Sequence, residues 1–326
     1  MHENITDAYA HVGLPRFGSL DQLLRYMDVH KVTRSVAVLG PLVPDIDTLA
    51  QAASLHSDRL RMIGIPFGET KEERLETVEL QLDAGVLGIR FEYRESMENP
   101  QLLSAVGSRG RWAYGIDACR DHRIAAMYVS WLAEYPDASL AVPHFMYPNF
   151  SAQDPERAGG AIAELMGHPR FYGILVRNLG MCGSAYPHTE YKAWISYVME
   201  QCGHKHLMWG SEYPVLLWRN ECAKSTMDLF RDFLGSYSEE QFTRVIDANA
   251  VDQFFLGAPP ASKPIVIPEW IEHKFQRNRK VPFFPKGLEL PTDVYSRILD
   301  EYLRSPEFEK GSSMSDYLLK AWTTDH

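Results

Sequence analysis

The sequence has few cysteines, no long hydrophobic run and no recognisable export signal. Its 326 residues include only 4 cysteines, and they form no C-x-x-C pair. This spacing predicts free thiols in a reducing cytoplasm rather than a disulfide framework. No apolar run reaches the roughly 18 residues that a membrane-spanning helix needs. The first ten residues, MHENITDAYA, lack the basic start and apolar centre of a secretory signal.

Basic residues are also under-represented. The 43 acidic residues outnumber the 33 basic ones, which leaves a formal net charge of -10. This balance argues against a surface for nucleic acid or for an anionic membrane. One basic stretch, 273–282 (HKFQRNRKVP), is therefore expected to be a solvated surface or a subunit contact.

Short apolar, β-branched runs alternate with amphipathic helical segments along most of the chain. In the helical segments, apolar residues recur at i, i+3, i+4 and i+7, as one buried face requires. The clearest helices span 19–30, 71–85, 156–168 and 190–203. The candidate strands span 4–11, 35–40, 61–66, 86–92, 124–129, 138–144, 172–178 and 206–212.

Eight strand–helix units over the first 260 residues predict a (β/α)8 TIM barrel. A doubly wound sheet is the alternative, but the turn HVGLPRFGS after the first strand is not a glycine-rich phosphate loop. The fifth and sixth candidate strands are joined only by SWLAEYPD, which is short for a crossover. The composition of the sequence changes after residue 260, where proline-rich segments precede two expected helices near 292–304 and 313–323. We expect residues 261–326 to form a helical arm or lid that covers the barrel mouth or makes a homodimer.

Polar side chains gather at the carboxyl ends of these strands, where TIM barrels place their active sites. Period-two geometry puts Tyr9 and His11 on one face of their strand, and it likewise puts Arg90 and Glu92 on one face of theirs. Each residue also has a structural alternative: a core histidine, a packed tyrosine, or an Arg90–Glu92 pair that only satisfies itself. The strand ends supply Tyr9, His11, Arg90, Glu92, Tyr128, His144, Arg177, Asn178 and Glu212. By contrast, His204 and His206 precede the eighth strand, at the wrong end of the barrel, so a structural role is expected.

Five motifs resemble the amidohydrolase superfamily, in the branch of aminocarboxymuconate-semialdehyde decarboxylases and pyrone-dicarboxylate lactonases. DAYAHVG is similar to the family's D-x-H-x-H opening, and HLMWGSEYP to its G-S-D-x-P strand. AGVLGIRFEY, YPDASLAVPHF and IDANAVDQFFLG resemble three further family segments. The similarity covers residues 5 to 257 and implies a (β/α)8 barrel acting on a carbonyl, lactone, amide or carboxylate substrate.

The departures from the family pattern concern its metal ligands. Tyr9 stands where the family has a first histidine, Tyr128 aligns with its fifth-strand histidine, and Glu212 replaces its aspartate. A neutral phenol is a poor metal ligand. We therefore expect no metal or other cofactor. In the alternative, His11, His144 and Glu212 hold zinc or manganese as a two-histidine, one-carboxylate site.

The resulting hypothesis is a metal-independent hydrolase of a small, carboxylate-bearing lactone or amide. Glu212 is the expected general base, and His144 and His11 act with it at the reacting carbonyl. Arg90, Arg177, Tyr9, Tyr128, Glu92 and Asn178 are the expected substrate-binding residues. A decarboxylase or other lyase of the same superfamily and a non-catalytic binding barrel are the two alternatives. Converging buried polar groups argue against the last.

Overall fold

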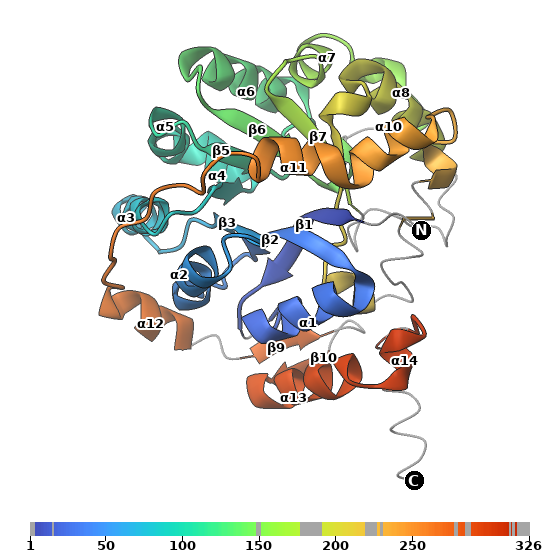
Figure 1. The fold of residues 1–326 in the computed structure, drawn as a ribbon. Helices are drawn as coiled ribbons and strands as arrows, with labels where there is room; N and C mark the ends of the chain where they lie inside the picture. Colours follow the sequence, from blue (N-terminus) through green and yellow to red (C-terminus); the bar gives the residue numbers. More distant parts are fainter. Residues whose placement is uncertain are drawn as a thin grey trace.

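The computed structural model describes residues 4–14, 16–147, 151–176, 191–218, 227–228, 231–276, 280–283, 288–312, 314 and 317. Its centre is an eight-stranded parallel sheet in the order β1 to β8, so neighbours in sequence are neighbours in space (Figure 1). Helices surround this sheet, and the predicted (β/α)8 TIM barrel is confirmed. The strands are β1 (Ile5–Val12), β2 (Val32–Leu39), β3 (Leu60–Gly64), β4 (Gly88–Phe91), β5 (Trp112–Gly115), β6 (Ser139–Val142), β7 (Phe171–Leu175) and β8 (Leu207–Trp209).

Most helices lie where apolar periodicity and capping residues place them. Ser19 caps the first helix through a reciprocal capping box with Gln22, and Thr70 does the same with Glu73 before the third. None of the helices in the described ranges is long and apolar enough to cross a membrane. The helices around the barrel are α1 (Leu20–His30), α2 (Ile46–Leu55), α3 (Lys71–Asp83), α4 (Tyr93–Glu98), α5 (Pro100–Ser108), α6 (His122–Glu134), α7 (Ala161–Met166), α8 (Lys192–Cys202), α10 (Glu239–Thr243) and α11 (Asn249–Phe254).

The barrel closes between its first strand and the segment after its last. The backbone N–H of Glu212 donates to the carbonyl of Tyr9 at 2.9 Å, and that of His11 donates to the carbonyl of Tyr213 at 2.6 Å. A buried cluster fills the interior with side chains from several strands, including Val36, Ile63, Tyr114, Ala141 and Ile174. Because these contacts link the two ends of the barrel sequence, the residues around Tyr9 and Glu212 are brought together by the closure itself.

The prediction of a fifth strand at 124–129 is wrong. These residues lie in α6, whose buried positions 124, 125, 128, 131 and 132 follow helical periodicity. Asp121 begins this helix by accepting hydrogen bonds from the N–H groups of Arg123 and Ile124. The true β5 is the four-residue segment WAYG between Gly110 and Asp117, too short for an apolar-run criterion. The correct strand makes the crossover to β6 a full helix, which resolves the short connection noted in the sequence.

The C-terminal extension runs along the outside of the barrel from one end to the other. Just before it, the carbonyl of Phe254 at the end of α11 accepts from Arg61 at the beginning of β3, at the amino end of the barrel. The chain then passes Asp83, where the N–H of Lys263 donates to its carbonyl. The extension contains α12 (Glu269–Gln276), the antiparallel pair β9 (Lys280–Phe283) and β10 (Leu288–Pro291), α13 (Thr292–Leu303) and α14 (Pro306–Glu309).

Within the extension, α13 lies against α1 (Figure 1). Its buried Tyr295, Leu299 and Tyr302 join the core that the barrel helices share. The predicted helix at 292–304 is therefore confirmed, whereas most of 313–323 lies outside the described residues. Packing on the chain's own barrel buries these apolar side chains, and the homodimer stays a prediction.

Candidate active site

The predicted catalytic residues lie at the carboxyl ends of their strands. His11 is the penultimate residue of β1, Arg90 lies in β4, and Glu92 follows that strand directly. His144 comes just after β6, and Glu212 follows β8. This is the end of a TIM barrel at which active sites form. His204 and His206 precede β8 instead, and His206 Nδ1 bonds the carbonyl of Phe171, as a structural role requires.

Arg90, Tyr9 and Glu92 form one connected cluster. The Nε of Arg90 donates to the hydroxyl of Tyr9 at 3.1 Å, and its Nη1 lies 2.8 Å from Glu92 Oε1. Burial lowers the pKa of Arg90, but Tyr9 and Glu92 outweigh it, so the pKa ends above its ordinary value. Burial raises the pKa of Tyr9 to about 12 even though Arg90 opposes the shift. At neutral pH the cluster therefore holds a guanidinium cation, a neutral phenol and a partly exposed carboxylate.

His11 is held as a neutral imidazole. Its Nδ1 lies 3.0 Å from the carbonyl of Val38, which can only accept, so Nδ1 carries the proton and Nε2 a lone pair. Burial, together with the nearby Arg90, lowers the pKa of His11 to about 3. One ring face stacks on Phe17 at 4.4 Å, and Tyr9 meets His11 edge-on at 5.0 Å. His11 can accept a hydrogen bond in the site, but it is not a cation there.

His144 and Glu212 form the second polar contact of the site. His144 Nε2 lies 3.4 Å from Glu212 Oε1, and both side chains are almost fully buried. Both residues have left-handed backbone conformations, with φ of 58° and 60° respectively. Such conformations are uncommon outside glycine and cost energy, so they mark positions that the surrounding structure imposes. The chain thus accepts local strain to present this histidine and this carboxylate to each other.

A buried aspartate, Asp7, links the segment that carries Glu212 to strand β1. Asp7 accepts hydrogen bonds from the N–H of Ser211, the hydroxyl of Ser211 and the N–H of Tyr9. Burial raises the pKa of Asp7 to about 6, although the bonds from Ser211 oppose the rise. Asp7 therefore ties the residue before Glu212 to the strand that carries Tyr9 and His11. It acts on the site by positioning these neighbours.

Asp117 is a candidate residue that the sequence reasoning missed. It follows the true β5, and it is near enough to Glu92, His144 and Arg90 for all three to act on its pKa. Burial raises that pKa, and Glu92 raises it further, while Arg120, His144 and Arg90 oppose the shift. Correct placement of the WAYG strand before Asp117 would have revealed it. Its raised pKa is the property expected of a proton donor.

Three predicted substrate-binding residues, Tyr128, Arg177 and Asn178, are not among the strand-end residues that the structure describes. Because Tyr128 lies in α6, its predicted position at a strand end is wrong. Its hydroxyl pairs with Ser96 Oγ at 2.8 Å behind β5, where burial raises its pKa, and this placement removes the basis for a substrate contact. Arg177 and Asn178 lie outside the described residues. Of the cysteines, Cys119 and Cys202 are free and buried as expected, and Cys182 and Cys222 also lie outside the described residues.

These residues are a poor fit for a divalent metal. Within the described ranges, no group of three His, Cys, Asp or Glu side chains converges closely enough to hold an ion. Arg90 also donates to the Tyr9 hydroxyl, the atom at the position of the missing histidine. A fixed guanidinium at this point would repel a dication rather than help to coordinate it.

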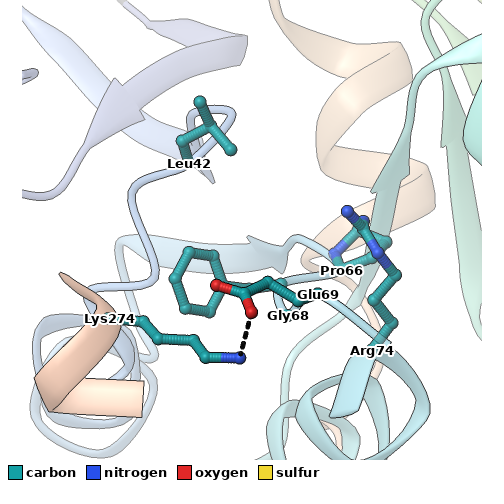
Figure 2. Close-up of a pocket in the computed structure, with 7 residues that line it drawn as sticks. Leu42, Pro66, Gly68, Glu69, Arg74 and Lys274 are labelled. Carbon is teal, nitrogen blue, oxygen red and sulfur yellow. Dashed lines mark ion pairs between the residues drawn. The ribbon is translucent and has the colours of Figure 1, made fainter. Parts of the chain in front are cut away.

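A separate cavity of about 260 Å³ lies beside the barrel mouth (Figure 2). Lys274 of α12 faces Glu69 across it at 3.4 Å, and also pairs with Glu73 at 2.6 Å. Arg74 pairs with Glu95, so the cations around this cavity already have partners. The cavity shares no lining residue with the site of His11, His144 and Glu212. Its lining residues are Leu42, Pro66, Phe67, Gly68, Glu69, Arg74 and Lys274.

Comparison with known proteins supports the fold assignment. No protein-family model and no curated protein sequence matches the chain. Among solved structures, it resembles a probable 2-pyrone-4,6-dicarboxylic acid hydrolase from Acinetobacter baumannii with citric acid bound, at a TM-score of 0.55 and 15% identity, over 77% of this chain and 99% of the other. It also resembles an amidohydrolase from Burkholderia multivorans with bound zinc, at a TM-score of 0.58 and 15% identity, over 78% and 99% of the two chains.

A third similar structure is an amidohydrolase 2 protein from Bifidobacterium longum subsp. infantis, with a TM-score of 0.52 and 15% identity, over 78% of this chain and 99% of the other. Each of the three is matched over 99% of its own length. The barrel fold that the sequence resemblance implied is therefore confirmed. The chain has the barrel fold of the amidohydrolases and pyrone-dicarboxylic acid hydrolases.

Proposed function

We propose that this protein is an enzyme that hydrolyses a small lactone or amide carrying a carboxylate, without a metal ion. The observation that carries the proposal is the buried contact between Glu212 and His144, at the same barrel end as the Arg90 cluster. A carboxylate, a histidine and a guanidinium are the groups needed for proton transfer, carbonyl polarisation and anion binding. The strained φ values of His144 and Glu212 support a functional rather than a structural role.

Arg90 is the proposed binding group for the substrate carboxylate. An arginine has five N–H donors, and among the described residues two of these face Tyr9 and Glu92. These two contacts hold the plane of the guanidinium, which suits paired hydrogen bonds to a carboxylate. The substrate is thereby oriented with its reacting carbonyl toward His144 and Glu212.

The proposed reaction begins with water attacking the carbonyl carbon. Glu212 accepts a proton from the water as the new C–O bond forms, and the carbonyl oxygen becomes an oxyanion. His144 stabilises that oxyanion because it lies in a buried, water-poor environment. Collapse of the intermediate then breaks the bond to the ring oxygen or to the amide nitrogen, and the products are an acid and an alcohol or amine.

The leaving oxygen or nitrogen needs a proton in this last step. Asp117 is the proposed donor because burial and Glu92 raise its pKa. The residues thus divide the two proton transfers between two carboxyl groups in different surroundings, as acid–base pairs in other enzymes do. Water gives one proton to Glu212, and the leaving group receives one from Asp117; Glu212 then releases a proton to solvent and Asp117 takes one up, which restores both groups.

The similar structures suggest the first substrate to test. One of them is named a probable hydrolase of 2-pyrone-4,6-dicarboxylic acid, which is a lactone with two carboxylates. We expect the protein to turn over a compound of this class, and the loss of the lactone absorbance would measure that turnover. A panel of lactones and amides, each with and without a carboxylate, would identify the preferred bond.

The decisive variant is Glu212→Gln, which keeps size and removes proton acceptance. Turnover should fall by about 10²-fold or more, the usual contribution of a general base, while substrate affinity changes little. The matched control is Glu98→Gln, an exposed carboxylate in α4. Near-normal turnover in Glu212→Gln would remove this residue from catalysis and leave the proposal without its base.

A further inference from the structure

Arg16 is a cation of the barrel mouth that no step above uses. It lies in the loop after β1, and its Cζ is 5.1 Å from the centre of the Phe17 ring. Phe17 stacks in turn on His11 at 4.4 Å. Arg16 and His11, a residue of the candidate active site, therefore lie against the same aromatic ring.

The charge of Arg16 has little local compensation. Its Nε is inaccessible to solvent and has no hydrogen-bond partner in the part of the chain that the structure describes. Burial lowers the pKa of Arg16, and Arg90 lowers it further, so the two guanidinium groups lie near enough to repel each other. Glu212 and Tyr295 oppose the shift. A half-buried cation beside a second cation is costly unless an anion joins them.

The C-terminal extension holds this loop in place. A Cβ added to Gly18, whose φ is +91°, would lie only 2.8 Å from Leu299 of α13. On the neighbouring helix α1, Gln22 Nε2 donates to the carbonyl of Ser296 at 3.0 Å, and Arg25 Nε donates to that of Leu303 at 2.9 Å. These contacts clamp the loop and α1 against α13 (Figure 1).

We propose that Arg16 is a specificity-determining residue that binds an anionic group of the substrate remote from the reacting carbonyl, and that α13 of the C-terminal extension positions it. Arg90 would bind the carboxylate that orients the reacting carbonyl, and Arg16 would bind the second, remote anionic group. The bound chemistry is a carboxylate or similarly charged oxygen group, which suits the planar guanidinium donors. This inference rests on the proposed function only in taking the bound anion to be part of a substrate. Binding of the anion itself requires no reaction.

Binding of simple carboxylates tests the site without turnover. Malonate carries two carboxylates and acetate one, and their affinities for the full chain can be measured by calorimetry at constant ionic strength. We expect the unaltered protein to bind malonate more tightly than acetate. Arg16→Gln should weaken malonate binding by about 10-fold or more, as loss of a charge-assisted pair implies, and should change acetate binding little. The exposed Arg123→Gln is the control and should behave as the unaltered protein.

Thermal unfolding of the same variants separates ligand binding from a structural role. Because Arg16 is an undercompensated cation, Arg16→Gln should keep or raise the Tm of the free protein while losing malonate affinity. Leu299→Ala, which loosens α13 against Gly18, should also weaken malonate binding although Arg16 is present. Equal malonate affinities in Arg16→Gln and the unaltered protein, a lower Tm for Arg16→Gln, or no malonate binding by the unaltered protein would each overturn the proposal. An unchanged affinity in Leu299→Ala would overturn the role of α13.

The two proposals fail in different ways. If Glu212→Gln keeps normal turnover but malonate binding depends on Arg16, the anion site stands and the proposed reaction does not. If turnover depends on Glu212 but Arg16→Gln binds malonate normally, the reaction stands and the anion site does not.

Discussion

The Nε of Arg90 donates a hydrogen bond to the hydroxyl of Tyr9 across the barrel mouth, at 3.1 Å. The two residues come from β4 and β1, and each is buried. A tyrosine that is hydrogen-bonded to an arginine thus stands where the D-x-H-x-H motif, which this segment resembles, has its first histidine. This contact explains why a tyrosine at position 9 is compatible with the barrel: it gives a buried cation an acceptor.

Tyr9→Phe should separate this role from simple packing. The ring still packs against His11 and His144, but Arg90 Nε loses its acceptor, at a cost of about 1–3 kcal/mol for an unsatisfied buried donor. We expect turnover to fall roughly 10-fold as Arg90 loses its orientation. Tyr128→Phe is the matched control, because its hydroxyl bonds Ser96 behind β5. Steady-state kinetics should show the loss only at Tyr9, and equal losses in both variants would contradict it.

Metal content is a second test. With Arg90 at the Tyr9 hydroxyl, we expect less than one tightly held zinc, manganese or iron per purified chain, measured by elemental analysis. Dialysis against a chelator should leave turnover unchanged. If one metal per chain is found instead, His11, His144 and Glu212 become its ligands. Glu212→Gln should then lower the metal content together with the activity.

His11 should contribute to acid sensitivity. Its folded pKa of about 3 lies below the ordinary 6.5, so between these values the unfolded chain binds a proton that the folded chain does not. Stability from this group is therefore complete above about pH 6.5 and is lost as the pH falls toward 3. Asp7, whose pKa is raised from 3.8 to about 6, acts in the opposite direction: its ionisation costs stability as the pH rises through that range.

His11→Asn should accordingly flatten the acid side of the stability curve. Asparagine can still donate to the carbonyl of Val38 but does not titrate. We expect the loss of unfolding free energy between pH 7 and 4 to shrink by about 2–4 kcal/mol, measured by urea denaturation at a series of pH values. The exposed His122→Asn serves as the control. A variant as acid-sensitive as the unaltered protein would show that His11 does not carry this effect.

The C-terminal extension should be part of the folded unit. Phe308 is buried against Tyr302 and His30, at ring distances of 5.3 and 4.8 Å. Phe308→Ala should therefore lower the free energy of unfolding by about 3–5 kcal/mol, as a cavity in a packed core does. Val266→Ala, at a residue that is 87% exposed, should change it by less than about 0.5 kcal/mol. A small loss in Phe308→Ala, with a separate melting transition for the extension, would contradict this.

Local patterns were sufficient to predict most of the barrel and half of its site. Strand and helix periods are properties of neighbouring residues, so seven strands, the helix at 292–304 and the strand-end positions of His11, Arg90, Glu92, His144 and Glu212 were predictable from sequence alone. The Arg90–Glu92 pair also follows from local geometry, because residues two apart on a strand share a face. The fifth strand was not predictable in this way, since WAYG is short and the helix after it contains a longer apolar run.

Only the tertiary structure decided which distant side chains meet. Closure of β1 against the segment after β8 brings Tyr9 and Asp7 to Ser211 and Glu212, more than 200 residues away in the chain. The same closure and the left-handed turns at His144 and Glu212 set their 3.4 Å contact. Burial then decided the charge states, because the low pKa of His11 and the raised pKa of Asp117 depend on surroundings that no local pattern encodes. The loop after β1 likewise meets α13 at Gly18 and Leu299, which are more than 250 residues apart in the chain, so no local pattern predicts this contact.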